Sequence, residues 1–128
     1  MLTKFITRML KGEQPTIFGD GKQSRDFTFV DDVVGANLLA CKAERRGVAG
    51  RVFNVATGQR IDLVQTFQIL KKLLGYSGEA KYADDRAGDV KHSLADISRA
   101  EQLLGYKPTV GFEEGLRRTI EWYRSNNC

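Results

Sequence analysis

The chain has 128 residues, of which 41% are hydrophobic and 28% are charged. This size and composition suit one soluble globular domain, and no run approaches the roughly 20 apolar residues that a membrane span needs. The formal net charge of +4 comes from 20 basic and 16 acidic residues spread along the sequence, so we expect neither a nucleic-acid nor a membrane partner.

The first residues and the cysteines indicate the compartment. The opening MLTKFITRMLKGEQ has polar residues where a signal peptide carries a continuous apolar block. Two cysteines, Cys41 and Cys128, are too few for a disulfide framework or a metal cluster, and we expect both as reduced thiols. We therefore predict a cytoplasmic protein.

Helical and extended patterns alternate in the first third of the chain. Residues 2–10 carry apolar side chains at helical spacing and are followed by Gly12, which predicts a short helix. Pro15 opens the extended stretch PTIFG, and RDFTFV alternates as a strand does. Asp31 or Asp32 is predicted to cap the next helix. The expected apolar face of that helix consists of Val34, Leu38 and Cys41.

The middle of the chain predicts a strand followed by a well-delimited helix. RVFNVATG is rich in β-branched and aromatic residues and ends at Gly58. Asp62 has Gln65 three residues on, the spacing of a capping box, and Gly75 is placed as the stop of the helix. The expected buried stripe consists of Leu63, Phe67, Leu70 and Leu74.

The last third predicts a short strand in EAKYA, a loop with Arg86 and Gly88, and two helices. ADISRAEQLLGYKP ends in a Gly-then-Pro pattern, and FEEGLRRTIEWYRS is expected to bury Leu116, Ile120 and Tyr123. The fold class is therefore mixed, helix-rich α/β with short strands and about five helices. Such a sheet is too small for a complete Rossmann fold.

Several catalytic and cofactor signatures are missing from the sequence. No Gly-x-Gly-x-x-Gly follows a strand, and none of the four tyrosines has a lysine four positions later. His92 has no neighbouring serine or cysteine nucleophile and no second metal ligand, so we interpret it as a hydrogen-bonding surface residue. We expect no catalytic residue, no metal site and no cofactor-binding residue in this chain.

Five residues have the chemistry needed to hold a nucleotide anion. Arg25 and Arg86 each offer a planar fork that matches phosphate oxygens. Asp89 can accept hydrogen bonds from sugar hydroxyls, and the Asn54 amide can both donate and accept. Phe18 offers an aromatic face to a base. Singly, each also has a purely structural interpretation.

Those structural interpretations stay open at this point. Arg25 would pair with Asp26 or Asp31, Asn54 would close a turn, and Phe18 would fill the core.

The combined pattern favours binding because four separated motifs agree with one family. IFGDGKQSRDFTFVDDVVGANLLA, VFNVATG, RAGDVKHSLADISRAEQLLGYKP and GFEEGLRRTIEWY occur in this order. They resemble the C-terminal, substrate-binding half of the NAD-dependent epimerase/dehydratase family, the extended short-chain dehydrogenase/reductase enzymes that act on nucleotide sugars. The resemblance covers essentially the whole chain. Within the family, the motifs resemble those of UDP-glucose or UDP-N-acetylglucosamine 4-epimerases more than those of dTDP-glucose dehydratases.

The resemblance implies a role for each candidate residue. Arg25 and Arg86 would contact the diphosphate, and Asp89 would hold the ribose. Phe18 would lie at the uracil, and Asn54 near the diphosphate. The family's catalytic machinery, a Gly-rich NAD site and a Tyr-x-x-x-Lys pair on a Rossmann half, is missing from these residues.

The sequence therefore predicts residues 1–128 as a single nucleotide-sugar-binding domain without the Rossmann domain, not catalytic alone and weak in its affinity for a UDP-sugar. NAD would belong to the full-length family rather than to this chain, and whether the chain is an enzyme stays open. The alternative is an interaction or oligomerisation module, or half of a split epimerase that docks to a separate Rossmann subunit through apolar surface left exposed.

Overall fold

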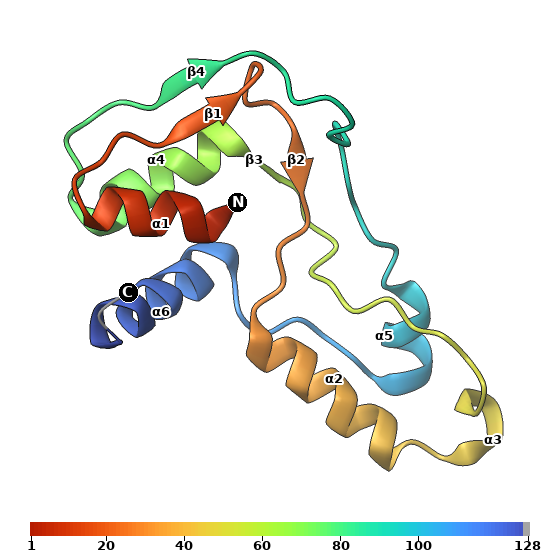
Figure 1. The fold of residues 1–128 in the computed structure, drawn as a ribbon. Coiled ribbons are helices and arrows are strands. Elements are labelled where there is room, and N and C mark those ends of the chain that lie inside the picture. The colour runs from red at the N-terminus through yellow and green to blue at the C-terminus, as the bar shows by residue number, and fades with distance from the viewer. Residues whose placement is uncertain (127–128) are drawn as a thin grey trace. The chain divides into compact units, whose positions relative to one another are not determined.

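The computed structural model describes residues 1–126, and these separate into two compact units (Figure 1). The first unit consists of Met1–Ser24, Ile61–His92 and the residues from Glu113 onward. The second unit consists of Arg25–Arg60 and Ser93–Phe112. Each unit therefore gathers segments that are distant in the sequence.

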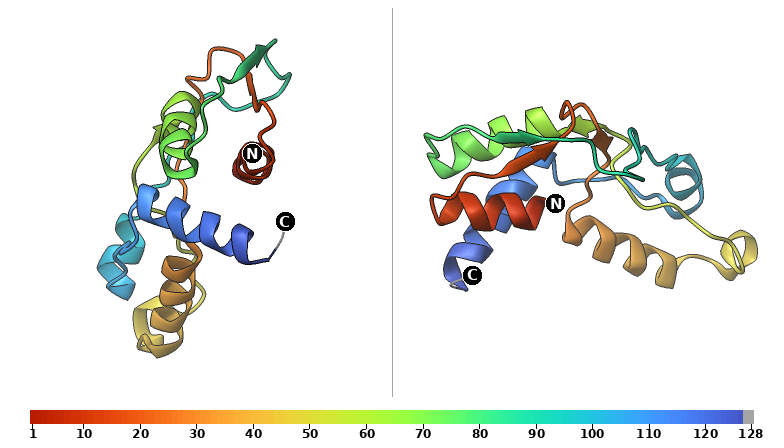
Figure 2. Two further views of the ribbon diagram at one scale, coloured as in Figure 1. Left: turned by 90° about the vertical axis from the view of Figure 1, so that its left-hand side faces the viewer. Right: turned by 45° about the horizontal axis from the view of Figure 1, so that its top comes forward.

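The first unit combines a small parallel sheet with helices. Strand β1 (Thr16–Phe18) pairs in parallel with β4 (Lys81–Ala83), as Figure 1 shows. Helices α1 (Leu2–Leu10) and α4 (Leu63–Leu74) pack against each other in the views of Figure 2. Nearly all of α6 (Phe112–Ser125) also belongs to this unit. Its buried apolar residues include Phe5, Ile6, Met9, Ile17, Leu63, Phe67, Leu70, Leu116 and Ile120.

Helix α4 begins and ends where its local signals predict. Strand β3 (Ile61–Asp62) leads into it and pairs with β2 (Ser24–Arg25). The Asp62 carboxylate accepts a hydrogen bond from the Gln65 backbone at 2.7 Å, and the Gln65 side chain accepts one from the Asp62 backbone, which completes the capping box. Gly75 ends the helix in the left-handed conformation. The predicted stripe is buried except for Leu74, which is half-buried.

The second unit is built from α2 (Val30–Lys42), the short α3 (Arg45–Val48) and α5 (Ser98–Leu104). Its buried cluster consists of Ala36, Ala56, Ile97, Ala100, Leu104 and Tyr106. The Tyr106 hydroxyl donates to the carbonyl oxygen of Ala56 at 2.8 Å, so its polar atom is satisfied inside the core. Burial, with a smaller effect from two nearby carboxylates, raises the pKa of the Tyr106 phenol.

Two aspartates hold the irregular segments of the second unit. Asp26 accepts hydrogen bonds from the backbone amides of Thr57 and Gly58, each at 2.9 Å, and from the Thr57 hydroxyl. Asp32 is only 4% exposed and accepts from the amide and hydroxyl of Thr109, at 2.8 and 2.7 Å, and from the amide of Val110 at 3.2 Å. Each carboxylate therefore fixes a turn that lies far away in the sequence.

The structure corrects three expectations about this unit. Residues 51–58 are not a strand but belong to an irregular segment, 51–60, because no described strand pairs with them. Within RDFTFV, only Arg25 is in strand conformation, and the helix already starts at Val30. Neither Asp31 nor Asp32 caps α2: its N-cap is Phe29, and both aspartates lie in the first turn.

The expected apolar face of α2 is exposed rather than buried. Val34 and Leu38 are 51% and 54% exposed, and Val30 and Val33 extend this surface. Cys41 is a free, exposed thiol, whereas Cys128 lies outside the described residues. Helix α2 instead turns Ala36 and Asp32 toward the core of its unit.

The fold class agrees with the sequence: the described residues form a mixed, helix-rich α/β structure with strands of two or three residues. Among residues 1–126, no helix has both the length and the apolar character needed to cross a membrane. Of the last helix, Leu116 and Ile120 are buried as expected, and Tyr123 is half-buried.

Candidate functional site

Arg86 and Asp89 are the two ends of one tight turn in the first unit. The Asp89 amide donates to the carbonyl oxygen of Arg86 at 3.1 Å. Gly88 lies at the third position of this turn with φ of 80°, a value that favours glycine. The Arg-x-Gly-Asp spacing therefore sets a guanidinium and a carboxylate on the same short loop.

The turn borders a cavity of about 280 Å³. The residues that line it are all polar or charged: two cations, three carboxylates and one amide. These are Arg86, Lys91, Asp20, Asp85, Asp89 and Gln23. The volume is near the lower limit for small-molecule sites, which suits part of a nucleotide sugar rather than the whole molecule.

The Gly19–Asp20–Gly21 turn after β1 supplies one wall of this cavity. A side chain at Gly19 would collide with the Asp85 carboxylate, because an added Cβ would lie 1.9 Å from Asp85 Oδ1. Asp20 faces Lys91 at 3.9 Å. The Lys22 amide donates to Asp20 Oδ1 at 2.9 Å and, together with the charges of Lys91 and Lys22, lowers the pKa of the Asp20 carboxyl.

Phe18 lies in the same unit, immediately before that turn. Its side chain is 42% exposed, so it does not fill the core, which removes the structural interpretation of this residue. The Gln23 side-chain amide donates to the Phe18 carbonyl oxygen at 2.8 Å and thereby connects β1 to the cavity lining. The structure thus gathers Phe18, Arg86 and Asp89 in one unit.

Arg25 and Asn54 belong to the second unit, so the structure does not gather all five predicted residues in one unit. The Asn54 side-chain amide donates to the carbonyl oxygen of Asp96 at 3.1 Å, which ties the irregular 51–60 segment to the start of α5. Beside Arg25, the Asp26 carboxylate is engaged by the turn at Thr57.

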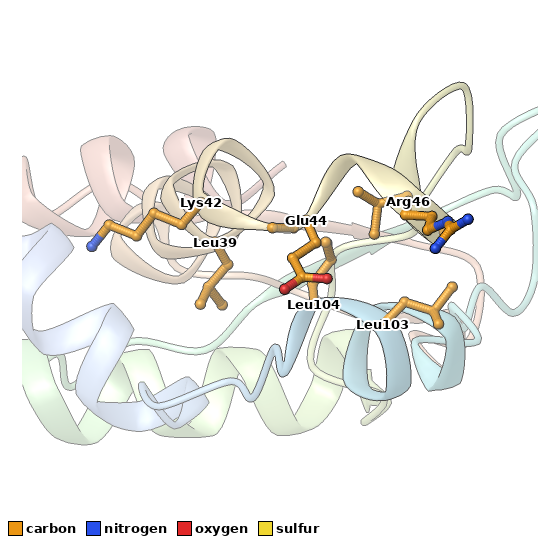
Figure 3. Close-up of a pocket in the computed structure, with 9 residues that line it drawn as sticks. Leu39, Lys42, Glu44, Arg46, Leu103 and Leu104 are labelled. Carbon is orange, nitrogen blue, oxygen red and sulfur yellow. The ribbon is translucent and has the colours of Figure 1, made fainter.

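A second cavity, of about 390 Å³, lies in the second unit between α2, α3 and the end of α5. Leu39, Leu103 and Leu104 line it, and Figure 3 shows that the charged ends of Lys42 and Arg46 extend away from each other. Because its polar groups diverge, this cavity lacks the converging contacts of a binding site.

Sequence reasoning missed four residues of the polar cavity: Asp20, Gln23, Asp85 and Lys91. Asp20 and Gln23 flank a Gly-x-Gly turn, which is a usable signal for backbone close to a ligand. Asp85 and Lys91 were not identifiable, because charged residues in a loop usually face solvent.

The comparisons with known proteins agree with this fold. Residues 1–119 match the family model described as GDP-mannose 4,6 dehydratase. The UDP-glucose 4-epimerase of Thermotoga maritima, solved with UDP-glucose, is 42% identical with a TM-score of 0.92, over 99% of this chain and 40% of that one. The UDP-N-acetylglucosamine 4-epimerase of Methanobrevibacter ruminantium, in complex with UDP-N-acetylmuramic acid, is 41% identical with a TM-score of 0.90, over 98% and 39%.

A third structure contains a cofactor. The UDP-glucuronic acid 4-epimerase of Bacillus cereus, in complex with UDP-glucuronic acid and NAD, is 31% identical with a TM-score of 0.90, over 98% of this chain and 40% of that one. The chain belongs to the NAD-dependent epimerase/dehydratase family, and within it is similar to UDP-glucose and UDP-N-acetylglucosamine 4-epimerases. It spans about 40% of the length of these relatives.

Proposed function

We propose that this chain binds the nucleotide-diphosphate part of a UDP-sugar and does not catalyse turnover by itself. The observation that carries this proposal is the Arg86–Asp89 turn on a cavity lined by polar and charged residues. The guanidinium of Arg86 can donate two parallel hydrogen bonds to phosphate oxygens, and the Asp89 carboxylate can accept hydrogen bonds from a ribose diol. In this proposal Phe18 faces the uracil. A role of Arg25 and Asn54 near the diphosphate rests on the family resemblance alone.

The charges in the cavity argue for weak binding. Asp20 and Asp85 place two further carboxylates beside Arg86 and Lys91, and each would repel the diphosphate. All of these residues are exposed, so water competes for every hydrogen bond. The isolated chain therefore binds UDP weakly and gains affinity only when further contacts exclude water.

The described residues do not fit an NAD site. Strand β1 is followed by Gly19-Asp20-Gly21, but this turn leads to β2 rather than to the start of a helix, so it lacks the helix N-terminus that holds a pyrophosphate in a dinucleotide fold. The sequence also lacks a tyrosine with a lysine four positions later. No hydride or proton transfer can be assigned to this chain.

Two measurements test the proposal. NMR titration of the full chain with UDP should give saturable shifts at Arg86, Gly88 and Asp89, and Arg86→Ala should weaken them. Incubation with UDP-glucose and NAD should give no epimerised product. Turnover above background would contradict the second half of the proposal, and unchanged spectra up to millimolar UDP would contradict the first.

A second candidate function is favoured by the exposed apolar face of α2. Val30, Val33, Val34 and Leu38 form it. We propose that this face receives an NAD-binding domain, because about 60% of the length of these relatives lies outside the part that matches this chain and one of them holds NAD. A split epimerase would use the same face for a separately encoded subunit. The alternative occupant of this face is a second copy of this chain. Calorimetric titration with the NAD-binding domain and sedimentation of the chain alone distinguish the two occupants.

A further inference from the structure

The loop that carries Arg86 and Asp89 is tied to the first unit at both ends. At its start, the Gly19 amide donates to the carbonyl oxygen of Ala83 at 2.8 Å, where β4 pairs with β1. At its end, the Ser24 amide donates to the carbonyl oxygen of Lys91, also at 2.8 Å. The intervening residues 84–90 therefore form a loop whose two ends are held by backbone contacts.

A side-chain contact strengthens the second tie. Ser24 and His92 form a parallel bridge, and the Ser24 hydroxyl lies 2.9 Å from Nδ1 of the His92 ring. Ser24 is only 6% exposed, whereas His92 is exposed. A buried hydroxyl needs a hydrogen-bond partner, and the imidazole supplies one from a position 68 residues further along the chain.

The position of His92 matters because Asp89 is only three residues away. Three residues span at most about 10 Å, so the end of the loop that the His92 contact holds lies within that distance of Asp89. Ser24 also lies between Gln23, which lines the cavity, and Arg25. One hydrogen bond therefore fixes the end of the loop against the strand that continues the other wall of the cavity.

We infer that Ser24 and His92 are positioning residues for the nucleotide-sugar site: their hydrogen bond holds the Arg86–Asp89 loop in the geometry that receives the ligand. This inference rests on the proposed function. Neither side chain needs to touch the ligand. Their contribution is to keep the loop in one arrangement before the ligand arrives.

The experiment uses the full chain and four variants. Ser24→Ala and His92→Ala remove the contact, while His92→Asn keeps a polar group near the position of Nδ1. The matched control is Tyr76→Phe, which removes the hydrogen bond from the Tyr76 hydroxyl to the carbonyl oxygen of Glu13, at 3.2 Å, between two other distant segments of the same unit. For each variant we measure the dissociation constant for UDP and amide hydrogen exchange in residues 84–92. The ¹⁵N shifts of the His92 imidazole are compared between wild type, Ser24→Ala and Tyr76→Phe.

We expect Ser24→Ala and His92→Ala to raise the UDP dissociation constant by about three- to tenfold, the range for loss of one hydrogen bond. Both should speed exchange in residues 84–92, and His92→Asn should restore most of the affinity. Ser24→Ala should also shift Nδ1 of His92. Tyr76→Phe should leave the UDP affinity, the loop exchange and the Nδ1 shift unchanged.

Failure of this inference is distinguishable from failure of the proposed function. If Arg86→Ala weakens UDP binding but Ser24→Ala and His92→Ala do not, the positioning role is overturned while the binding function stands. If UDP binds no variant and not the wild type, the binding function fails and the positioning role fails with it. Equal exchange in residues 84–92 for wild type, Ser24→Ala and His92→Ala would also overturn the positioning role, whatever the affinities.

Discussion

The backbone amide of Asp89 donates to the carbonyl oxygen of Arg86 across 3.1 Å, so the two residues that define the candidate site are the ends of a single turn. Their relative placement thus depends on the two residues between them. Ala87 accepts many conformations, but Gly88 has φ of 80°, which side chains rarely adopt.

Gly88→Ala is therefore expected to lower UDP affinity by disturbing the turn. An alanine at positive φ costs about 1–2 kcal/mol of local strain. Gly12→Ala is the matched control, because Gly12 has φ of 73° in the same unit and, like Gly88, has no atom within 4 Å of an added Cβ. UDP titration and thermal unfolding should show similar losses of stability for both variants, with affinity reduced only for Gly88→Ala. Equal affinities would contradict the role of the turn.

Arg25→Ala and Arg86→Ala should each reduce UDP affinity by about ten- to a hundredfold, because a hydrogen bond to a charged group contributes about 1.5–3 kcal/mol. NMR titration with UDP measures this. Lys22→Ala is the control, since Lys22 does not line the cavity and its amide contact to Asp20 does not involve the side chain. If Arg25 is purely structural, Arg25→Ala will shift the thermal midpoint and leave the titration curve unchanged.

Asp32→Ala should strongly destabilise the second unit. The substitution removes a buried acceptor that serves two donors of Thr109 and the buried amide of Val110, which costs about 2–4 kcal/mol. Asp31→Ala is the matched control, because Asp31 is exposed in the same first turn of α2. Urea unfolding followed by circular dichroism should show a much smaller change for the control. If both variants lower the urea midpoint equally, the hydrogen bonds of Asp32 to Thr109 and Val110 do not stabilise the second unit.

The acid side of the pH–stability curve should depend on Glu114. Hydrogen bonds from Arg117 and Arg118, each at 2.7 Å, lower the pKa of the Glu114 carboxyl from 4.5 to about 2. Because the pKa of Glu114 is lower in the folded than in the unfolded chain, its ionised carboxylate stabilises the fold. This contribution is complete above the unfolded-state pKa of about 4.5 and is lost as the pH falls from about 4.5 to about 2.

The measurement is the difference in thermal midpoint between wild type and Glu114→Gln from pH 7 to pH 2. We expect the wild type to be more stable at pH 7 and the difference to shrink below pH 4.5. Glu113→Gln is the control, since Glu113 forms an ion pair with the exposed Lys72 in α4, at 3.2 Å. A difference that stays constant with pH would show that the Glu114 charge is not responsible.

The exposed face of α2 predicts association with an NAD-binding domain. Replacing Val34 and Leu38 with lysine should weaken that association at least tenfold, reduce binding of a hydrophobic dye and leave the thermal midpoint unchanged. Val52→Lys is the control, because Val52 is a single apolar residue, 78% exposed, outside the helices of the same unit.

Calorimetric titration measures the association, with the separately produced part of the Bacillus cereus epimerase, solved with NAD, that lies outside the match to this chain. Sedimentation of the chain alone gives its self-association. Docking lost in the double lysine variant supports the proposal. Self-association through the same face, without docking, would assign the face to a second copy instead.

The sequence predicts best where the signal is local. The capping box of Asp62 and Gln65 and the stop at Gly75 involve neighbouring residues, so α4 is delimited without knowledge of the fold. The segment 51–60 shows the opposite case. Its β-branched residues favour a strand, but a strand also needs a partner, and Phe53, Val55 and Ala56 instead pack into the core of the second unit.

In the candidate site, too, local features were predictable from the sequence and long-range contacts were not. Arg86 and Asp89 were identifiable from their chemistry and from a motif in which they lie three residues apart, whereas the contact between Ser24 and His92 joins residues 68 positions apart. In the sequence Asp32 is one of two candidates for a helix cap and Asp26 is a candidate partner of Arg25. Their carboxylates accept hydrogen bonds from Thr109 and Thr57, 77 and 31 residues away. The roles of Phe18, Arg25 and Asn54 in binding stay predictions, as does the single-domain organisation of residues 1–128.

Because both ends of the 84–90 loop are held by backbone hydrogen bonds, much of its conformational entropy is lost when the chain folds. A ligand that binds there meets a loop already restricted, so less of its binding free energy is spent on ordering the protein. Because its ends are fixed, the loop can also change in length. Residues inserted between Ala83 and Lys91 would enlarge the loop at a cost that grows only with the logarithm of its length, without moving the strands that anchor it.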